Sequence, residues 1–141
     1  MELTIEKAKE EFEKWLEHKK IKPSRRKTYE TQEETLIEAI ADGDLVLKDD
    51  FTFEYTLLTP VETDNGEIIL DKLVFKPRIR KQELINHYKG LKPDDADGRL
   101  LATMAALTDR TESKMPITRQ LIGKIYTEDM AVCESLAIYF L

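Results

Sequence analysis

The first forty residues place apolar side chains at helical spacing among many charged ones. Steps of three and four from about residue 4 to residue 20 are typical of an amphipathic helix with a narrow apolar stripe. The stripe consists of Ile5, Ala8, Phe12, Trp15 and Leu16. Pro23 is expected to end this helix, because proline cannot continue a helix interior. A second helix is predicted from near Tyr29 or Thr31 to Gly43.

The pattern changes to a period of two just after residue 50. Apolar residues alternate with Thr and Glu from Phe51 to Leu57, which predicts a strand with one buried face. Asn65-Gly66 is a pair that readily adopts two positive φ angles, and residues 68–75 then form the returning strand. The sequence therefore predicts a β-hairpin with a tight two-residue turn.

Helical spacing returns after Pro77 in several short segments. The first ends at Gly90, and the second starts around Asp95 to Asp97, where acidic residues favour a helix N-terminus. A third has Pro116 in its first turn, and the last is capped by Thr127. We therefore predict an α+β fold, mainly helical, with the hairpin between an N-terminal helical arm (residues 1–48) and a helical domain of short helices (residues 49–141).

The charge balance narrows the choice of partners. The chain of 141 residues has 22 Lys and Arg against 28 Asp and Glu, a formal net charge of -6. An acidic chain is poorly suited to sequence-independent nucleic-acid binding. No apolar run suggests a signal peptide or a membrane span, and the single cysteine, Cys133, excludes an internal disulfide. We expect a cytoplasmic protein that does not associate with membranes.

Residues able to carry chemistry are few and scattered. His18 and His87 lack the spacing of metal ligands, and no glycine-rich phosphate loop occurs. The acidic turn at residues 94–98 fails as a calcium loop, because Pro93 and Met104 would stand at the first and last ligand positions. It is better interpreted as a helix cap. We therefore expect no catalytic site, no cofactor and no metal, and interpret the chain as not an enzyme.

One run of positive charge keeps a second hypothesis open. Six basic residues lie between Lys19 and Lys27, enough to contact phosphates even on an acidic protein. The candidate nucleic-acid contacts are Lys22, Arg25, Arg26 and Lys27. The competing interpretation is a solvated linker between the two N-terminal helices. The alternative function is thus a small nucleic-acid-associated regulator.

The order of short motifs from residue 55 onward points to a protein family. Two strand motifs are followed by a helix of small residues that ends in Leu107-Thr108. An acidic residue then begins the final helix, and the sequence ends in Phe-Leu. These motifs are Leu57-Leu58-Thr59-Pro60-Val61, Leu73-Val74-Phe75-Lys76-Pro77, Asp129 and Phe140-Leu141. In this layout, residues 55–141 resemble the tail-assembly chaperones of Mu-like bacteriophages, although the first 48 residues are longer than the usual leader.

The resemblance implies that the chain binds another protein. The expected client is a tape-measure or tail-tube protein, held without nucleotide or metal, and a homo-oligomer is compatible with that role. A chaperone of this kind needs exposed apolar side chains to cover its client. The candidate contacts are Phe12, Trp15, Leu16, Leu136 and Phe140. The competing interpretation of the same stripes is burial in the chain's own core.

Overall fold

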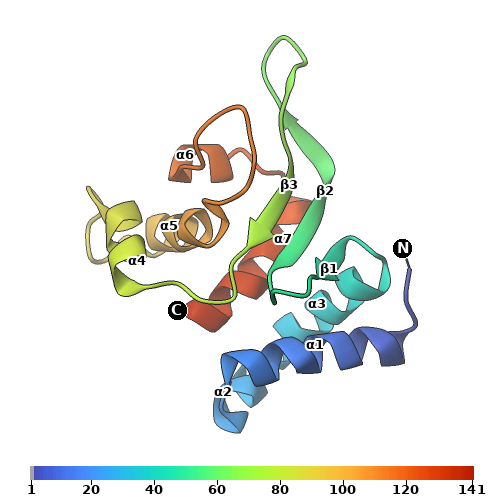
Figure 1. Ribbon diagram of the computed structural model, residues 1–141. Coiled ribbons are helices and arrows are strands. Elements are labelled where there is room, and N and C mark those ends of the chain that lie inside the picture. Colours follow the sequence, from blue (N-terminus) through green and yellow to red (C-terminus); the bar gives the residue numbers. More distant parts are fainter. Residues whose placement is uncertain (1) are drawn as a thin grey trace.

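In the computed structural model, which describes residues 2–141, helices precede and follow one antiparallel sheet (Figure 1). The N-terminal elements are α1 (Ile5–Lys19), α2 (Pro23–Thr28) and α3 (Glu30–Ala41). The strands are β1 (Leu45–Leu47), β2 (Phe53–Glu62) and β3 (Ile68–Phe75). The remaining helices are α4 (Lys81–Tyr88), α5 (Ala96–Thr108), α6 (Arg119–Ile122) and α7 (Thr127–Ala137), followed by the 3-10 turn η1 (Ile138–Phe140). The predicted mainly helical α+β fold is confirmed.

The ends of the N-terminal helices follow from individual residues. Thr4 caps α1 by accepting a hydrogen bond from the Lys7 N–H at 3.2 Å. The predicted linker is wrong for residues 23–28, because α1 already ends at Lys19, with Lys20 in the left-handed conformation, and Pro23 starts a second helix. Proline suits the first position of a helix, where its missing N–H would have no intrahelical partner. The basic run is thus largely helical.

The sheet contains a strand that the sequence pattern did not indicate. β1 pairs antiparallel with β2, with Leu45 opposite Tyr55 and Leu47 opposite Phe53. Three residues are too few to show a period of two, so the prediction stopped at the hairpin. β1 and β2 lie on either side of Lys48, the predicted domain boundary. Residues from both sides also enter one hydrophobic core, so the N-terminal segment is part of the same folded unit.

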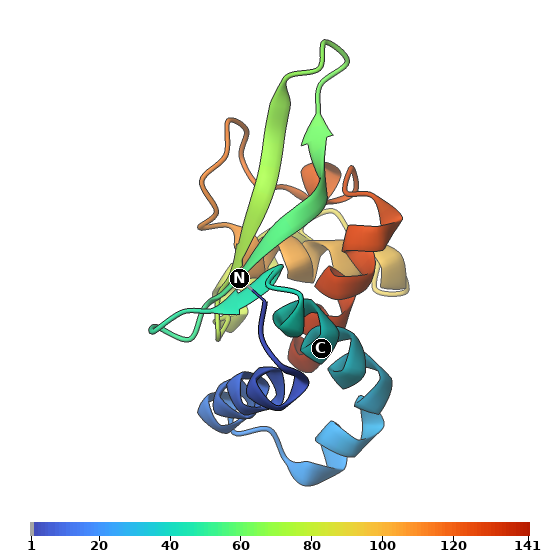
Figure 2. The ribbon, with the colours of Figure 1, turned by 90° about the vertical axis from the view of Figure 1, so that its right-hand side faces the viewer.

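The hairpin is confirmed, but its turn differs from the prediction. Gly66 has φ 81°, whereas Asn65 is not among the residues with positive φ. The Thr63 N–H donates to the Glu67 carbonyl at 2.8 Å, and the Gly66 N–H donates to the Thr63 carbonyl at 2.9 Å. The loop therefore has three residues and ends in one residue with a left-handed conformation. The predicted turn had two residues, both with positive φ. The hairpin tip extends beyond the helices (Figure 2).

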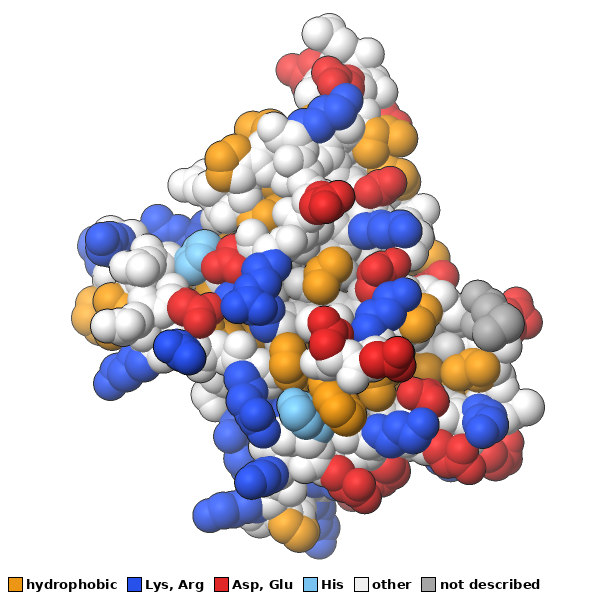
Figure 3. Space-filling model, viewed as in Figure 1, with side chains coloured by type: hydrophobic (Ala, Val, Ile, Leu, Met, Phe, Trp, Pro, Cys, Tyr) orange, Lys and Arg blue, Asp and Glu red, His pale blue; other side chains and the backbone are white. Residues whose placement is uncertain are grey.

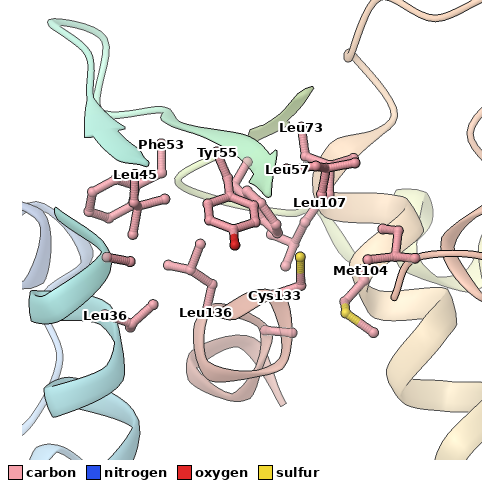
Figure 4. Packing of buried hydrophobic residues seen from close by; sticks show 14 of the residues in the cluster. Leu36, Leu45, Phe53, Tyr55, Leu57, Leu73, Met104, Leu107, Cys133 and Leu136 are labelled. Atoms are coloured by element: carbon pink, nitrogen blue, oxygen red, sulfur yellow. The ribbon is translucent and has the colours of Figure 1, made fainter. Parts of the chain in front are cut away.

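The core lies between one face of the sheet and the helices. Leu136 and Cys133 of α7 point toward the sheet below Tyr55 and Leu57, with Leu36 on one side (Figure 4). Met104 and Leu107 of α5 close the other side (Figure 4). Burial raises the pKa of the Cys133 thiol, which makes this cysteine a poor nucleophile.

A buried carboxylate joins α7 to an irregular part of β2. The β2–β3 register shifts between Thr56 and Val61. Asp129, which is 0% exposed, accepts hydrogen bonds from the Leu58 N–H at 2.8 Å and the Thr59 N–H at 3.0 Å. It also accepts one from the Tyr55 hydroxyl at 2.7 Å. These bonds satisfy backbone groups that the interrupted ladder would otherwise leave unpaired.

Two helix starts in the C-terminal half are displaced from their predicted positions. α6 begins at Arg119, with Thr118 as its cap, and therefore excludes Pro116. Tyr126, not Thr127, stands at the cap position of α7. The acidic turn behaves as predicted, because the Asp95 side chain accepts a hydrogen bond from the Gly98 N–H at 2.9 Å and caps α5.

Candidate protein-binding groove

Four of the five predicted protein-contact residues belong to the core. Phe12 and Leu136 are 0% exposed, Trp15 is 1% and Leu16 is 4%. The expectation that they contact a client is therefore wrong for the folded chain, in which no partner could reach them. A narrow apolar stripe has the same pattern whether it faces another chain or the protein's own core. Trp15 packs 5.3 Å from the Phe53 ring, centroid to centroid, so the stripe holds α1 against the sheet.

Phe140, the fifth predicted contact, remains half-buried and lies at a groove between α4 and α5. The groove has a volume of about 530 Å³. Its apolar wall includes Ile85, which is 50% exposed, and Leu141, which is 57% exposed. The C-terminal residues lie between α4 and the α1–α2 region (Figure 1). The other lining residues are Lys81, Leu84, Tyr88, Ala96, Arg99 and Leu100.

A second hollow continues the first across the C-terminal segment. It has a volume of about 280 Å³ and shares Leu100 and Leu141 with the larger groove. Its other walls come from α3 and from the α7–η1 segment, including Thr35 and Ile138. We call the two hollows together the C-terminal groove.

Positive charges gather beside Phe140 and Leu141. The Lys19 ammonium lies 3.5 Å from the Phe140 ring centroid, and Arg25 Nη2 donates to the main-chain oxygen of Leu141 at 2.8 Å. Burial, together with the nearby Arg78 and Arg25, lowers the pKa of Lys19 to about 8. Lys81 and Arg99 line the groove itself, and the described residues that line its larger part include no Asp or Glu.

The predicted nucleic-acid contacts do not all remain available. Arg26 donates to Glu33 at 2.8 Å and to Glu13 at 3.0 Å, and these hydrogen bonds raise its pKa. Arg26 therefore ties α1 to α3 through α2 and is already neutralised by carboxylates. Lys22 and Lys27 are exposed, while Arg25 is directed toward Leu141. The basic run thus contributes fewer uncompensated charges than its sequence indicates.

The fold also brings together a cluster of charged side chains that the sequence pattern did not indicate. Lys76, which is 3% exposed, contacts Glu83 and lies 2.9 Å from Asp109. His87 Nε2 lies 3.5 Å from the other oxygen of Asp109, and Lys76 lowers the pKa of Glu83. These residues come from three separate segments, so their spacing in the sequence did not indicate that they form a cluster. The cluster ties α4, one wall of the groove, to α5 and the end of β3.

Within residues 2–141, no helix combines the length and the apolar character needed to cross a membrane. The same residues contain no group of three or more His, Cys, Asp or Glu side chains placed to hold a metal ion. In comparisons with protein-family models, curated proteins and solved structures, no significant match was found.

Proposed function

We propose that this protein is a non-catalytic binding protein that holds a helical segment of another chain in the C-terminal groove. Because residues 55–141 resemble tail-assembly chaperones, the proposed client is a tape-measure or tail-tube protein of a phage or prophage. The client would be bound in the host cytoplasm before assembly. An amphipathic helix is the natural occupant of an apolar groove.

The observation that carries the proposal is the gathering of apolar side chains in one hollow. Ile85 and Leu141 are at least half exposed there, next to the partly buried Leu84, Leu100 and Phe140. Single exposed apolar residues are ordinary, but a contiguous apolar hollow is typical of a binding site. The other exposed apolar residues lie apart from it, among them Val46, Leu58 and Met115.

The groove is also preorganised. The Lys76 contacts with Glu83 and Asp109 hold α4 in place, and the Tyr88 hydroxyl lies 2.9 Å from the Thr103 hydroxyl on α5. A wall fixed before binding reduces the conformational entropy lost when a client docks.

The test is co-expression with the candidate tape-measure protein. The wild-type chain should increase the soluble yield of this client and co-purify with it. Ile85→Glu places a charge in the groove and should abolish both effects. Met115→Glu is the matched control, because Met115 is similarly exposed (44%) outside the groove. Equal loss with both variants, or co-purification that survives Ile85→Glu, would contradict the proposal.

One observation favours nucleic-acid binding as a second candidate function. Lys19 donates to the Pro77 carbonyl at 3.0 Å, and Arg78 donates to the His18 carbonyl at 2.8 Å. The basic run at residues 19–27 therefore meets a second run at residues 76–81, and basic side chains cluster at the lower left of Figure 3. A salt-sensitive gel shift of DNA that disappears with Arg25→Glu and Arg78→Glu would support this function. Absence of binding at low salt would remove it.

A further inference from the structure

We infer that the helix held in the C-terminal groove carries Asp and Glu along the borders of its apolar face. This inference rests on the proposed function, because it specifies the chemistry of the client at the same site. It is drawn from the charges that line the larger hollow, whereas the smaller hollow is lined by Glu134 and by no Lys or Arg among the described residues.

Three basic side chains, of which Arg99 lines the groove and Lys19 lies against Phe140, are positioned by backbone carbonyls. Lys19 donates to Pro77 at 3.0 Å, Arg78 donates to His18 at 2.8 Å, and Arg99 donates to Pro93 at 3.2 Å. A carbonyl oxygen orients a cation without cancelling its charge. Arg99 therefore keeps its net charge and can pair with a partner, whereas Lys19 is partly buried and its pKa is lowered to about 8, which disfavours its charged form.

Several basic residues elsewhere in the fold are compensated by carboxylates. Arg26 pairs with Glu13 and Glu33, Lys76 pairs with Glu83 and Asp109, and Lys114 pairs with Glu67. Lys48 and Lys72 likewise lie within salt-bridge distance of Glu54. The larger hollow differs from these sites, because Lys81 and Arg99 line it and no Asp or Glu among the described residues does.

The cations lie where the edges of a docked helix would pass. Lys81 and Arg99 come from α4 and α5, the two walls of the larger hollow. Lys19 covers the ring of Phe140 at the C-terminal side of the same hollow. A helix with its apolar face in the groove would place its flanking residues next to these groups.

A protein helix can cover the apolar side chains of the groove and also pair with its cations, whereas a nucleic acid can only pair with the cations. Phosphates would pair with the cations but would leave the apolar side chains of the groove exposed to water. An acidic-edged amphipathic helix covers Ile85 and Leu84 and neutralises Lys81 and Arg99 in one binding mode.

The experiment uses three synthetic peptides of about 20 residues, a length at which a helix becomes marginally stable alone. All share one Leu face at helical spacing, and their flanking positions carry Glu, Gln or Lys. Binding of the labelled peptides to the full chain is followed by fluorescence anisotropy. The Glu peptide should bind about tenfold more tightly than the Gln peptide and more tightly still than the Lys peptide, with a preference that weakens in salt.

Charge reversal assigns the preference to the groove. The double variant Lys81→Glu with Arg99→Glu should remove the advantage of the Glu peptide and favour the Lys peptide, because both side chains line the groove. Lys124→Glu is the control, because Lys124 is an exposed lysine between α6 and α7 and does not line the groove. Circular dichroism of each variant checks that the fold is retained, and Lys81→Gln alone provides a milder change in case the double variant unfolds.

The outcomes separate this inference from the proposed function. Equal binding of all three peptides would overturn the acidic-edge inference and leave the groove as a helix-binding site. Failure of every peptide to bind would overturn both. A duplex DNA that binds with higher affinity than the Glu peptide, and whose binding is lost with the Lys81 and Arg99 reversals, would overturn the inference in favour of a nucleic-acid partner.

Discussion

At the scale of single residues, Asp129 determines how the irregular part of β2 is stabilised. Its two carboxylate oxygens receive three hydrogen bonds from β2, two from backbone N–H groups and one from Tyr55. Burial, together with the hydrogen bond to Asp129, raises the pKa of Tyr55. An irregular strand thus depends on one side chain that lies far away in the sequence.

Asp129→Asn should destabilise the protein markedly. The asparagine amide group would bring a donor against the Thr59 N–H, where the carboxylate offers an acceptor. Loss of a charge-assisted bond to a buried backbone group costs about 2 kcal/mol, measured as the free energy of unfolding in urea. Glu128→Gln, at an exposed position on the same turn of α7, should change this free energy by less than about 0.5 kcal/mol. Equal stability of both variants would refute the structural role of Asp129.

Lys19 should give the protein a measurable dependence of stability on pH. Its pKa is about 8 in the folded chain and 10.5 in the unfolded chain, because burial, Arg78 and Arg25 disfavour the charged form. Between these values the unfolded chain binds more protons, so the free energy of unfolding rises with pH.

The measurement compares wild type with Lys19→Met. From neutral pH to just below the ordinary tyrosine pKa of 10.0, wild type should gain stability relative to the variant. The tyrosines set the upper limit, because the raised pKa values of Tyr55 and Tyr139 reverse the trend at higher pH in both proteins. Parallel stability curves for the two proteins would show that Lys19 is not desolvated.

At the scale of elements, the hairpin loop tests whether one left-handed residue closes β2 onto β3. Gly66 has φ 81°, and an added Cβ would meet nothing within 4 Å. Gly66→Ala should therefore cost only the backbone penalty of about 1 kcal/mol, seen as a lower Tm. Asn65→Ala, at the neighbouring residue, should change Tm little, because Asn65 is not held at positive φ. Two equal losses would instead support the two-residue turn predicted from sequence.

At the scale of the whole molecule, α1 and the C-terminal half share one core, so the chain should unfold as one unit. Trp15, the single tryptophan, is 1% exposed and lies 5.3 Å from the Phe53 ring and 5.5 Å from the Tyr139 ring. Its fluorescence therefore reports contacts between residues 1–48 and 49–141. Denaturation followed by this fluorescence should coincide with denaturation followed by far-ultraviolet circular dichroism. Two separate transitions would restore the domain boundary near Lys48.

The sequence by itself determined most of the local structure. Apolar spacing located α1, α3, β2, β3 and the helices of the C-terminal half, because periods of 3.6 and 2 are properties of each element alone. Asp95 was correctly interpreted as a cap, since a cap needs only neighbouring residues. The β1 strand was missed, because its formation depends on pairing with β2.

Only the tertiary structure decided what each pattern is used for. The Phe12, Trp15 and Leu16 stripe packs inside the protein, while Phe140 lines a groove, although both patterns looked equally available for a partner. Lys19 and Arg78 lie close together because each donates a hydrogen bond to the segment that carries the other. Burial and charge compensation are properties of residues brought together in space, so periodicity along one chain does not determine them.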